Sequence, residues 1–182
     1  QLRADLAVGS EEAAPADSGT RDLAGALPTR AGAPGCTVAE RLKPEKLFQD
    51  FLALREHMGV EIIPLEKGGN VFRELVRRAH TGRRIMALLA DRDLTNSGVE
   101  VELLGQPARL AVGPAALALA TKRPLYFAAI RGDRIEQLHG PRRWGIDLAF
   151  IGPVEPPPPG PDAVRIYTQR WADLLTDHIR EY

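Results

Sequence analysis

Acidic side chains follow two apolar stretches of this chain, where they could handle protons or hold a polar ligand. The run 84–90 ends in Asp91-Arg92-Asp93, and a shorter β-prone run, 36–39, ends in Glu40. Open α/β sheets carry their chemistry outside the carboxyl ends of their strands. Two carboxylates at adjacent strand ends could orient a base or hold a polar acceptor. Asp91 is therefore the first candidate for an active-site residue.

The polar residues that could complete such a site are scattered along the chain. The whole set comprises Asp22, Glu40, Arg55, Asp91, Arg92 and Asp93. The same residues could instead form a network of ion pairs that braces loops, and spacing alone favours that structural interpretation.

Other common catalytic and metal-binding signatures are absent from the sequence. There is no G-x-G-x-x-G, Walker loop, G-x-S-x-G elbow or H-E-x-x-H. The 4 histidines have no metal-ligand spacing, and the single cysteine, Cys36, excludes a thiolate-rich zinc site. We therefore expect no metal and no resident cofactor, and we interpret Cys36 as a small core residue.

The charge balance argues against a nucleic-acid partner, because 24 basic and 24 acidic residues cancel. A local cluster of Arg77, Arg78, Arg83 and Arg84 could attract a phosphate group or an anionic membrane surface, although a solvated helix face is the favoured interpretation. The longest apolar stretches fall far short of the ~20 residues that a membrane-spanning helix needs. Any membrane contact would therefore be peripheral.

Segments of strand-like and helix-like periodicity alternate through most of the chain. This alternation predicts an α/β domain with a mixed central sheet and flanking helices. Residues 1–18 are expected to be disordered on composition, and residues 19–182 to form the domain. The predicted helices are 45–58, 71–81, 113–121 and 164–182, and the predicted strands are 36–39, 60–65, 84–90, 99–104, 106–109, 125–130, 135–138 and 146–151.

Four separated blocks of this sequence, in order, resemble one protein family. The blocks are Val38–Glu45, Phe51–Glu56, Ala90–Thr95 with Gly98–Val101, and Val112–Ala115. They resemble the bacterial lipid A lauroyl/myristoyl acyltransferase-like family, and within it the actinobacterial phosphatidylinositol mannoside acyltransferases, over roughly residues 19–182. The resemblance implies a glycerolipid acyltransferase-like fold.

The resemblance also implies an activity and a location. Such enzymes transfer a long-chain fatty acyl group from acyl-CoA, a co-substrate, to a sugar hydroxyl of a glycolipid. They work peripherally on the cytoplasmic face of the plasma membrane, so the implied partners are acyl-CoA, the glycolipid acceptor and that membrane surface. The family motif is His-x-x-x-x-Asp, in which the histidine removes the proton of the attacking hydroxyl and carboxylates orient it.

Carried over residue by residue, the resemblance assigns catalytic positions to Asp22 and Asp91. Asp22 matches the motif aspartate, and Asp91 matches the acidic residue paired with the histidine. The histidine position itself holds Asp17. A carboxylate of ordinary pKa near 4 is a much weaker base than imidazole. We therefore expect the activity of this chain to be impaired.

The resemblance assigns substrate-binding positions to Glu40, Arg55 and Arg92, with Glu40 and Arg55 on the acceptor side of the groove. Residues 1–17 lack the apolar strand expected ahead of the motif, so we expect them to be foreign to the family. We also expect the domain to be incomplete at the N-terminus and at the C-terminus. A second hypothesis, from a different class, is a non-catalytic remnant that binds acyl-CoA or lipid.

Overall fold

The structure of this protein is a computed structural model that describes residues 6–11, 32–41, 43–65, 70–90, 97–135 and 143–181. The description covers only the backbone at residues 6–11, 131–135 and 143–147. Asp17, Asp22, Asp91 and Arg92 lie outside the described residues.

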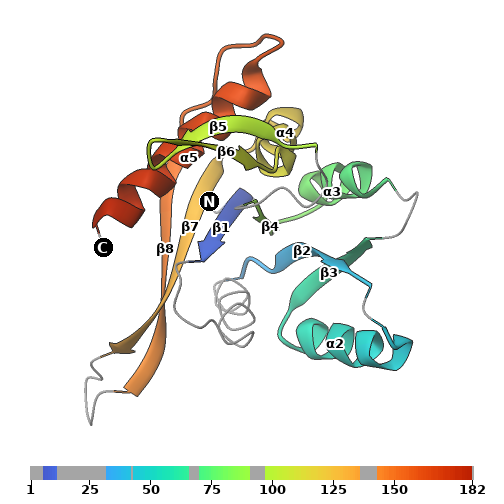
Figure 1. Cartoon of the computed structure of the whole chain (residues 1–182). Coiled ribbons are helices and arrows are strands. Elements are labelled where there is room, and N and C mark those ends of the chain that lie inside the picture. Colours follow the sequence, from blue (N-terminus) through green and yellow to red (C-terminus); the bar gives the residue numbers. More distant parts are fainter. Residues whose placement is uncertain are drawn as a thin grey trace.

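A six-stranded sheet in the order β3-β2-β4-β1-β7-β8 forms the centre of the fold (Figure 1). Neighbouring strands from β3 to β7 run parallel, and β8 runs antiparallel to β7. The mixed sheet predicted from the sequence is therefore confirmed. The strands are β1 (Leu6–Glu11), β2 (Gly35–Glu40), β3 (Val60–Leu65), β4 (Ile85–Leu89), β7 (Leu125–Ile135) and β8 (Arg143–Val154).

The other two strands, both predicted from the sequence, form a hairpin. β5 (Val99–Leu103) pairs antiparallel with β6 (Gln106–Leu110). The connecting residues, Leu104 and Gly105, both have positive φ, at 54° and 79°. Positive φ at both central residues is the geometry of the turn that matches the twist of a two-residue hairpin.

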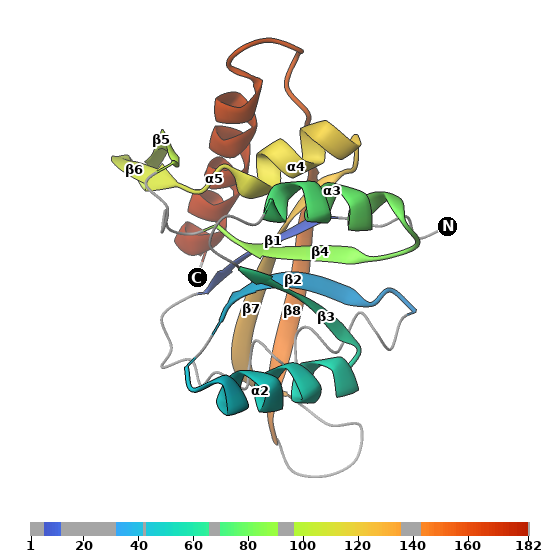
Figure 2. The same ribbon diagram turned by 90° about the vertical axis from the view of Figure 1, so that its right-hand side faces the viewer.

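Four described helices flank the central sheet, as expected of the α/β class. They are α2 (Glu45–His57), α3 (Val71–His80), α4 (Gly113–Thr121) and α5 (Ala163–Glu181). Figure 2 shows α3, α4 and α5 over one face of the sheet and α2 on the opposite side, where it packs against β3. The hydrophobic core lies under α4 and α5, where Trp171, Tyr167, Phe127 and Leu117 are fully or almost fully buried.

The N-terminal segment differs from the sequence prediction. Residues 1–18 are expected to be disordered, but Leu6–Glu11 forms β1, which lies between β4 and β7 in the sheet. Leu6 is in register with Met86 on one side and with Leu125 on the other. The apolar run Leu6–Val8 is too short to stand out against its polar neighbours, and its pairing depends on strands far away in the sequence.

The strand predicted at 135–138 is also corrected in part. Ile135 is the last residue of β7, which continues without a break from the predicted strand 125–130. Its long pairing with β8 runs from Leu125–Val154 to Ile135–Arg143. Polar residues such as Arg131 and Asp133 hide this continuation, because the sequence signal for a strand is mainly apolar.

Candidate functional site

The carboxyl ends of β1, β2 and β4 lie at one edge of the sheet, because these neighbouring strands are parallel. β2 ends at Glu40, whose side chain is exposed, and β4 ends at Leu89. The register of β2 with β4 includes Thr37–Ala87. The pairing ends there, and Glu40 and Ala90 each lie three residues further along the chain; Ala90 precedes Asp91 in the sequence. We call this end of the sheet, where the parallel strands finish, the carboxyl edge. Its described residues include Glu40, Leu65, Leu89 and Ala90.

Apolar side chains are exposed beside the carboxylate at the carboxyl edge. Leu65, the register partner of Glu40 at the end of β3, is 43% exposed. Leu89 at the end of β4 is 60% exposed, but strand alternation directs its side chain to the opposite face of the sheet from Glu40. A carboxylate next to uncovered apolar surface can meet a ligand that has both polar and apolar parts.

Arg55 occupies a different place from the carboxyl edge. It lies half-buried in the last turn of α2, where its guanidinium stacks 4.2 Å from the centre of the Phe51 ring. α2 begins just after β2 and runs back along the sheet, so Arg55 is about 15 Å along the helix from Glu45. In the part of the chain that the structure describes, no hydrogen bond or ion pair joins Arg55 to Glu40.

The β5–β6 hairpin contacts the two chain ends that flank the connection carrying Asp91. The Ala111 N–H donates to the Ala90 carbonyl at 3.4 Å. The Arg109 guanidinium donates through Nη2 to the Gly98 carbonyl at 2.8 Å. The Arg109 contact could not be predicted from the sequence, because Arg109 follows a turn and has the pattern of an exposed strand residue.

The hairpin is itself attached to α5 through side chains. Gln169 makes two hydrogen bonds to the backbone of Glu102, accepting from its N–H at 2.8 Å and donating to its carbonyl at 2.9 Å. Thr176 accepts from the Leu104 N–H at 3.2 Å. A glutamine on the polar side of an amphipathic helix carries no sequence signal for such a contact.

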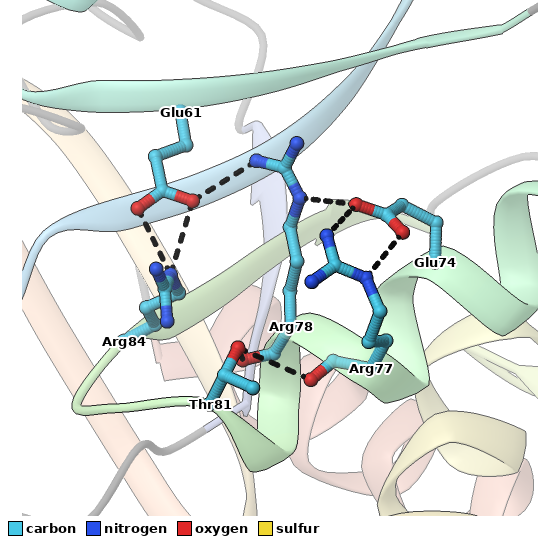
Figure 3. Close-up of polar contacts among 6 residues, drawn as sticks. All are labelled: Glu61, Glu74, Arg77, Arg78, Thr81 and Arg84. Atoms are coloured by element: carbon cyan, nitrogen blue, oxygen red, sulfur yellow. Dashed lines mark hydrogen bonds and ion pairs between the residues drawn. The ribbon is translucent and has the colours of Figure 1, made fainter.

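Ion pairs dominate the opposite edge of the sheet, where the parallel strands begin (Figure 3). Glu61 at the start of β3 accepts from Arg78 at 3.0 Å and from Arg84 at 2.9 Å. Glu74 on α3 accepts from Arg78 and Arg77, each at 2.8 Å. We call these five residues the amino-edge network. Three of the four clustered arginines are thus paired with carboxylates, which supports their structural interpretation.

The amino-edge network surrounds the only cysteine. Cys36 is completely buried at the start of β2. Burial raises the pKa of its thiol to about 11, although the nearby Arg78 opposes this shift. A thiol with so high a pKa holds almost no thiolate near neutral pH, so the prediction of a core cysteine is confirmed.

Residues 18–135 match the sequence profile of a family described as bacterial lipid A biosynthesis acyltransferase. This chain belongs to that family. The family resemblance drawn from the four sequence blocks is therefore confirmed. The matched range includes the carboxyl edge, the amino-edge network and the hairpin, whereas α5 follows it in the chain.

Curated relatives of this acyltransferase-family chain include phosphatidylinositol mannoside acyltransferases from two mycobacteria. The protein from Mycobacterium tuberculosis (strain ATCC 25618 / H37Rv) is 44% identical over 104 residues, which are 57% of this chain and 33% of the relative. The protein from Mycolicibacterium smegmatis is 42% identical over 109 residues, which are 60% of this chain and 36% of the relative. The chain thus spans about a third of the length of these relatives.

The remaining features of this family member concern membranes and metals. Among the helices that the structure describes, none is long and apolar enough to cross a membrane. Within the described ranges, no three histidine, cysteine or acidic side chains come close enough together to hold a metal ion.

Proposed function

We propose that this chain is an acyltransferase domain that moves a long-chain fatty acyl group from acyl-CoA to a sugar hydroxyl of a glycolipid, with phosphatidylinositol mannoside as the acceptor. Membership of the acyltransferase family and the names of the mycobacterial relatives support the reaction class and the acceptor. The observation that carries the proposal is the carboxyl edge, where Glu40 lies exposed beside the partly exposed Leu65 inside the matched range.

The proposed reaction needs a base, because a sugar hydroxyl is a poor nucleophile near neutral pH. As the hydroxyl loses its proton, its oxygen forms a bond to the thioester carbonyl carbon. The carbon–sulfur bond then breaks, and the coenzyme A thiolate leaves with a proton returned from the base. Asp17 stands at the position of the base, and Asp22 and Asp91 would orient and charge-balance that base.

The proposal predicts slow turnover for the chain as it stands. An ordinary carboxylate at position 17 is ionised near neutral pH but has little affinity for the proton that it must remove. Loss of an effective general base typically costs about 10²–10⁴ in rate. Asp17→His is therefore expected to raise turnover, measured with long-chain acyl-CoA and phosphatidylinositol mannoside. An Asp17→Asn control should remain as slow as the unchanged chain.

The failure of this experiment would be informative. If neither the unchanged chain nor Asp17→His transfers acyl groups to any mannosylated phosphatidylinositol, this chain is not a working acyltransferase domain. Turnover of the unchanged chain equal to that of Asp17→His would instead contradict the role given to position 17.

Substrate binding is proposed for Glu40, Arg55 and Arg92. A carboxylate such as Glu40 can accept hydrogen bonds from sugar hydroxyls, and the two guanidinium groups can donate to phosphate oxygens. Arg55 is held in place by the Phe51 ring, which lowers the entropy lost when it binds a ligand. Arg55→Ala should therefore weaken the binding of phosphatidylinositol mannoside, the proposed acceptor, in calorimetry.

The proposed place of action is the cytoplasmic face of the plasma membrane, with peripheral attachment. The support is the acceptor named for the mycobacterial relatives, a glycolipid whose acyl chains belong in a membrane. Sedimentation with vesicles that contain phosphatidylinositol mannoside tests this attachment. A chain that stays in the supernatant at every vesicle concentration would contradict it.

The second candidate function is a non-catalytic module that binds acyl-CoA or lipid. The observation that favours it is Asp17 at the position of the family histidine. This candidate predicts saturable binding of the acyl-CoA analogue together with no turnover by Asp17→His. The absence of any binding heat would contradict it.

A further inference from the structure

The two outermost strands of the central sheet, β3 and β8, differ in how well they could accept a further strand. β3 has 6 residues and includes Pro64, which has no N–H to donate to a neighbour. β8 has 12 residues, and among the described strands only β7 pairs with it. Figure 1 shows β8 at the margin of the sheet, beside β7. The outer side of β8 is therefore the longer row of backbone groups on which the described chain places no strand.

The middle of β8 carries little of the protection that natural sheets place on an outermost strand. Lysine, proline and bulges are common devices that prevent such a strand from pairing with another chain. Residues 146–151 include neither lysine nor proline, and Asp147 is their only charged residue. They are also in unbroken register with β7, from the pair Gly132–Ile146 to the pair Phe127–Ile151. We call residues 146–151 the open segment.

The described side chains of the open segment are only partly covered, on both faces of the sheet. Ala149 and Ile151 pack against the hydrophobic core but are only partly buried. Alternation along the strand directs Leu148 and Phe150 to the opposite face, where Phe150 is 45% exposed. The side chains of an inner strand are flanked by neighbours on both sides. The open segment thus has the partial burial of a strand that lacks one neighbour.

We propose that the open segment is a dimer interface, in which β8 pairs antiparallel with β8 of a second copy of this chain. Both copies use the same surface, so the assembly closes at two chains. Leu148 and Phe150 of both copies then lie on one face of the extended sheet, where they contact each other across the new strand pair. The outer backbone groups of β8 gain hydrogen-bond partners in this arrangement.

The sequence and the backbone favour a second copy as the partner. The open segment is apolar apart from Asp147, so an antiparallel copy of itself matches it in length and in character. Gly152, with a φ of 136°, and Pro153 follow directly and limit the pairing to a short length of strand. The opposite margin of the sheet cannot be extended in the same way, because Pro64 lies in β3. Two copies therefore form a closed pair and do not grow into a fibre.

Sedimentation velocity of the whole chain tests the dimer without any activity. Over a wide range of concentrations, the mass should rise from one chain to two chains and no further. Phe150→Lys should raise the dissociation constant at least about tenfold, because an ammonium group from each copy replaces an apolar contact. Phe72→Lys is the matched control, since Phe72 on α3 is 42% exposed and lies outside the open segment. The control should leave the dissociation constant unchanged.

Hydrogen exchange locates the interface in the unchanged chain. Backbone amides of Leu148–Ile151 should exchange more slowly at high than at low protein concentration, whereas amides of β4 should exchange equally at both. In Phe150→Lys, unchanged protection of β4 shows that the variant is folded. A single-chain mass at every concentration would overturn the proposal, as would growth beyond two chains. A dimer whose Leu148–Ile151 amides exchange equally at all concentrations, or one that Phe150→Lys does not weaken, would also overturn it.

Discussion

The two edges of the central sheet use carboxylates in opposite ways. At the amino edge, Glu61 is held by two arginines and is one part of a network of five charged side chains. At the carboxyl edge, Glu40 is exposed, and within the part of the chain that the structure describes it makes no hydrogen bond or ion pair through its side chain. A carboxylate whose lone pairs are already used stabilises the fold, whereas one whose lone pairs meet water is available to a ligand.

The difference follows from what each edge has to join. The amino-edge network connects β3, α3 and the approach to β4, so it braces three successive elements of the fold. The carboxyl edge has exposed leucines at the ends of β3 and β4. The comparison predicts that substitutions at the amino edge change stability and that substitutions at the carboxyl edge change activity.

The largest expected effect is on turnover. In the Asp17→His background, Asp91→Asn should lower kcat by about 10²–10⁴-fold, because the proposed role of Asp91 is to orient the base and balance its charge. Steady-state kinetics with acyl-CoA and the glycolipid measure this effect. Equal kcat values for the two proteins would remove Asp91 from the catalytic set.

The next largest effect is slow alkylation of the buried Cys36 thiol at the amino edge. Burial raises the pKa of this thiol to about 11 from an ordinary value of 9.0, so its thiolate fraction at neutral pH falls about 100-fold. Alkylation by iodoacetamide should be slower than that of a free cysteine by at least this factor, and urea should restore the ordinary rate. Fast alkylation of the folded protein would show that the Cys36 thiol is accessible to the reagent and would contradict its burial.

How far the sequence alone leads can be judged from particular elements. The two strands of the hairpin were predictable because their alternating residues act locally, and the four family blocks led to the correct family. β1 was not predictable, since the pairing of Leu6 with Met86 and Leu125 joins distant parts of the chain. The same limit applies to the site. Glu40 follows its strand as expected, but the separation of Arg55 from Glu40 depends on the direction of α2.

A smaller effect concerns the pH dependence of stability at the amino edge. Hydrogen bonds from Arg77 and Arg78 lower the pKa of Glu74 to about 2 from an ordinary value of 4.5. Because the folded-state pKa is the lower one, this contribution is complete above pH 4.5 and is lost as the pH falls toward 2. Glu74→Gln should therefore lose less stability than the unchanged chain between these pH values in urea denaturation. If the free energies of unfolding of the two proteins changed in parallel with pH, Glu74 would not contribute to the pH dependence of stability.

The contrast between the edges is tested most directly by one substitution at each, Glu61→Gln and Glu40→Gln, compared in the Asp17→His background. Glu61→Gln should lower the free energy of unfolding by about 1–2 kcal/mol and leave kcat/KM unchanged. The stability loss is kept this small because the ion-paired side chains of Glu61, Arg78 and Arg84 are partly exposed to water. Glu40→Gln should change the free energy of unfolding by less than about 0.5 kcal/mol and lower kcat/KM at least tenfold, because a carboxylate that binds the acceptor is lost. A loss of stability without loss of kcat/KM in Glu40→Gln would contradict the assignment of function to the carboxyl edge.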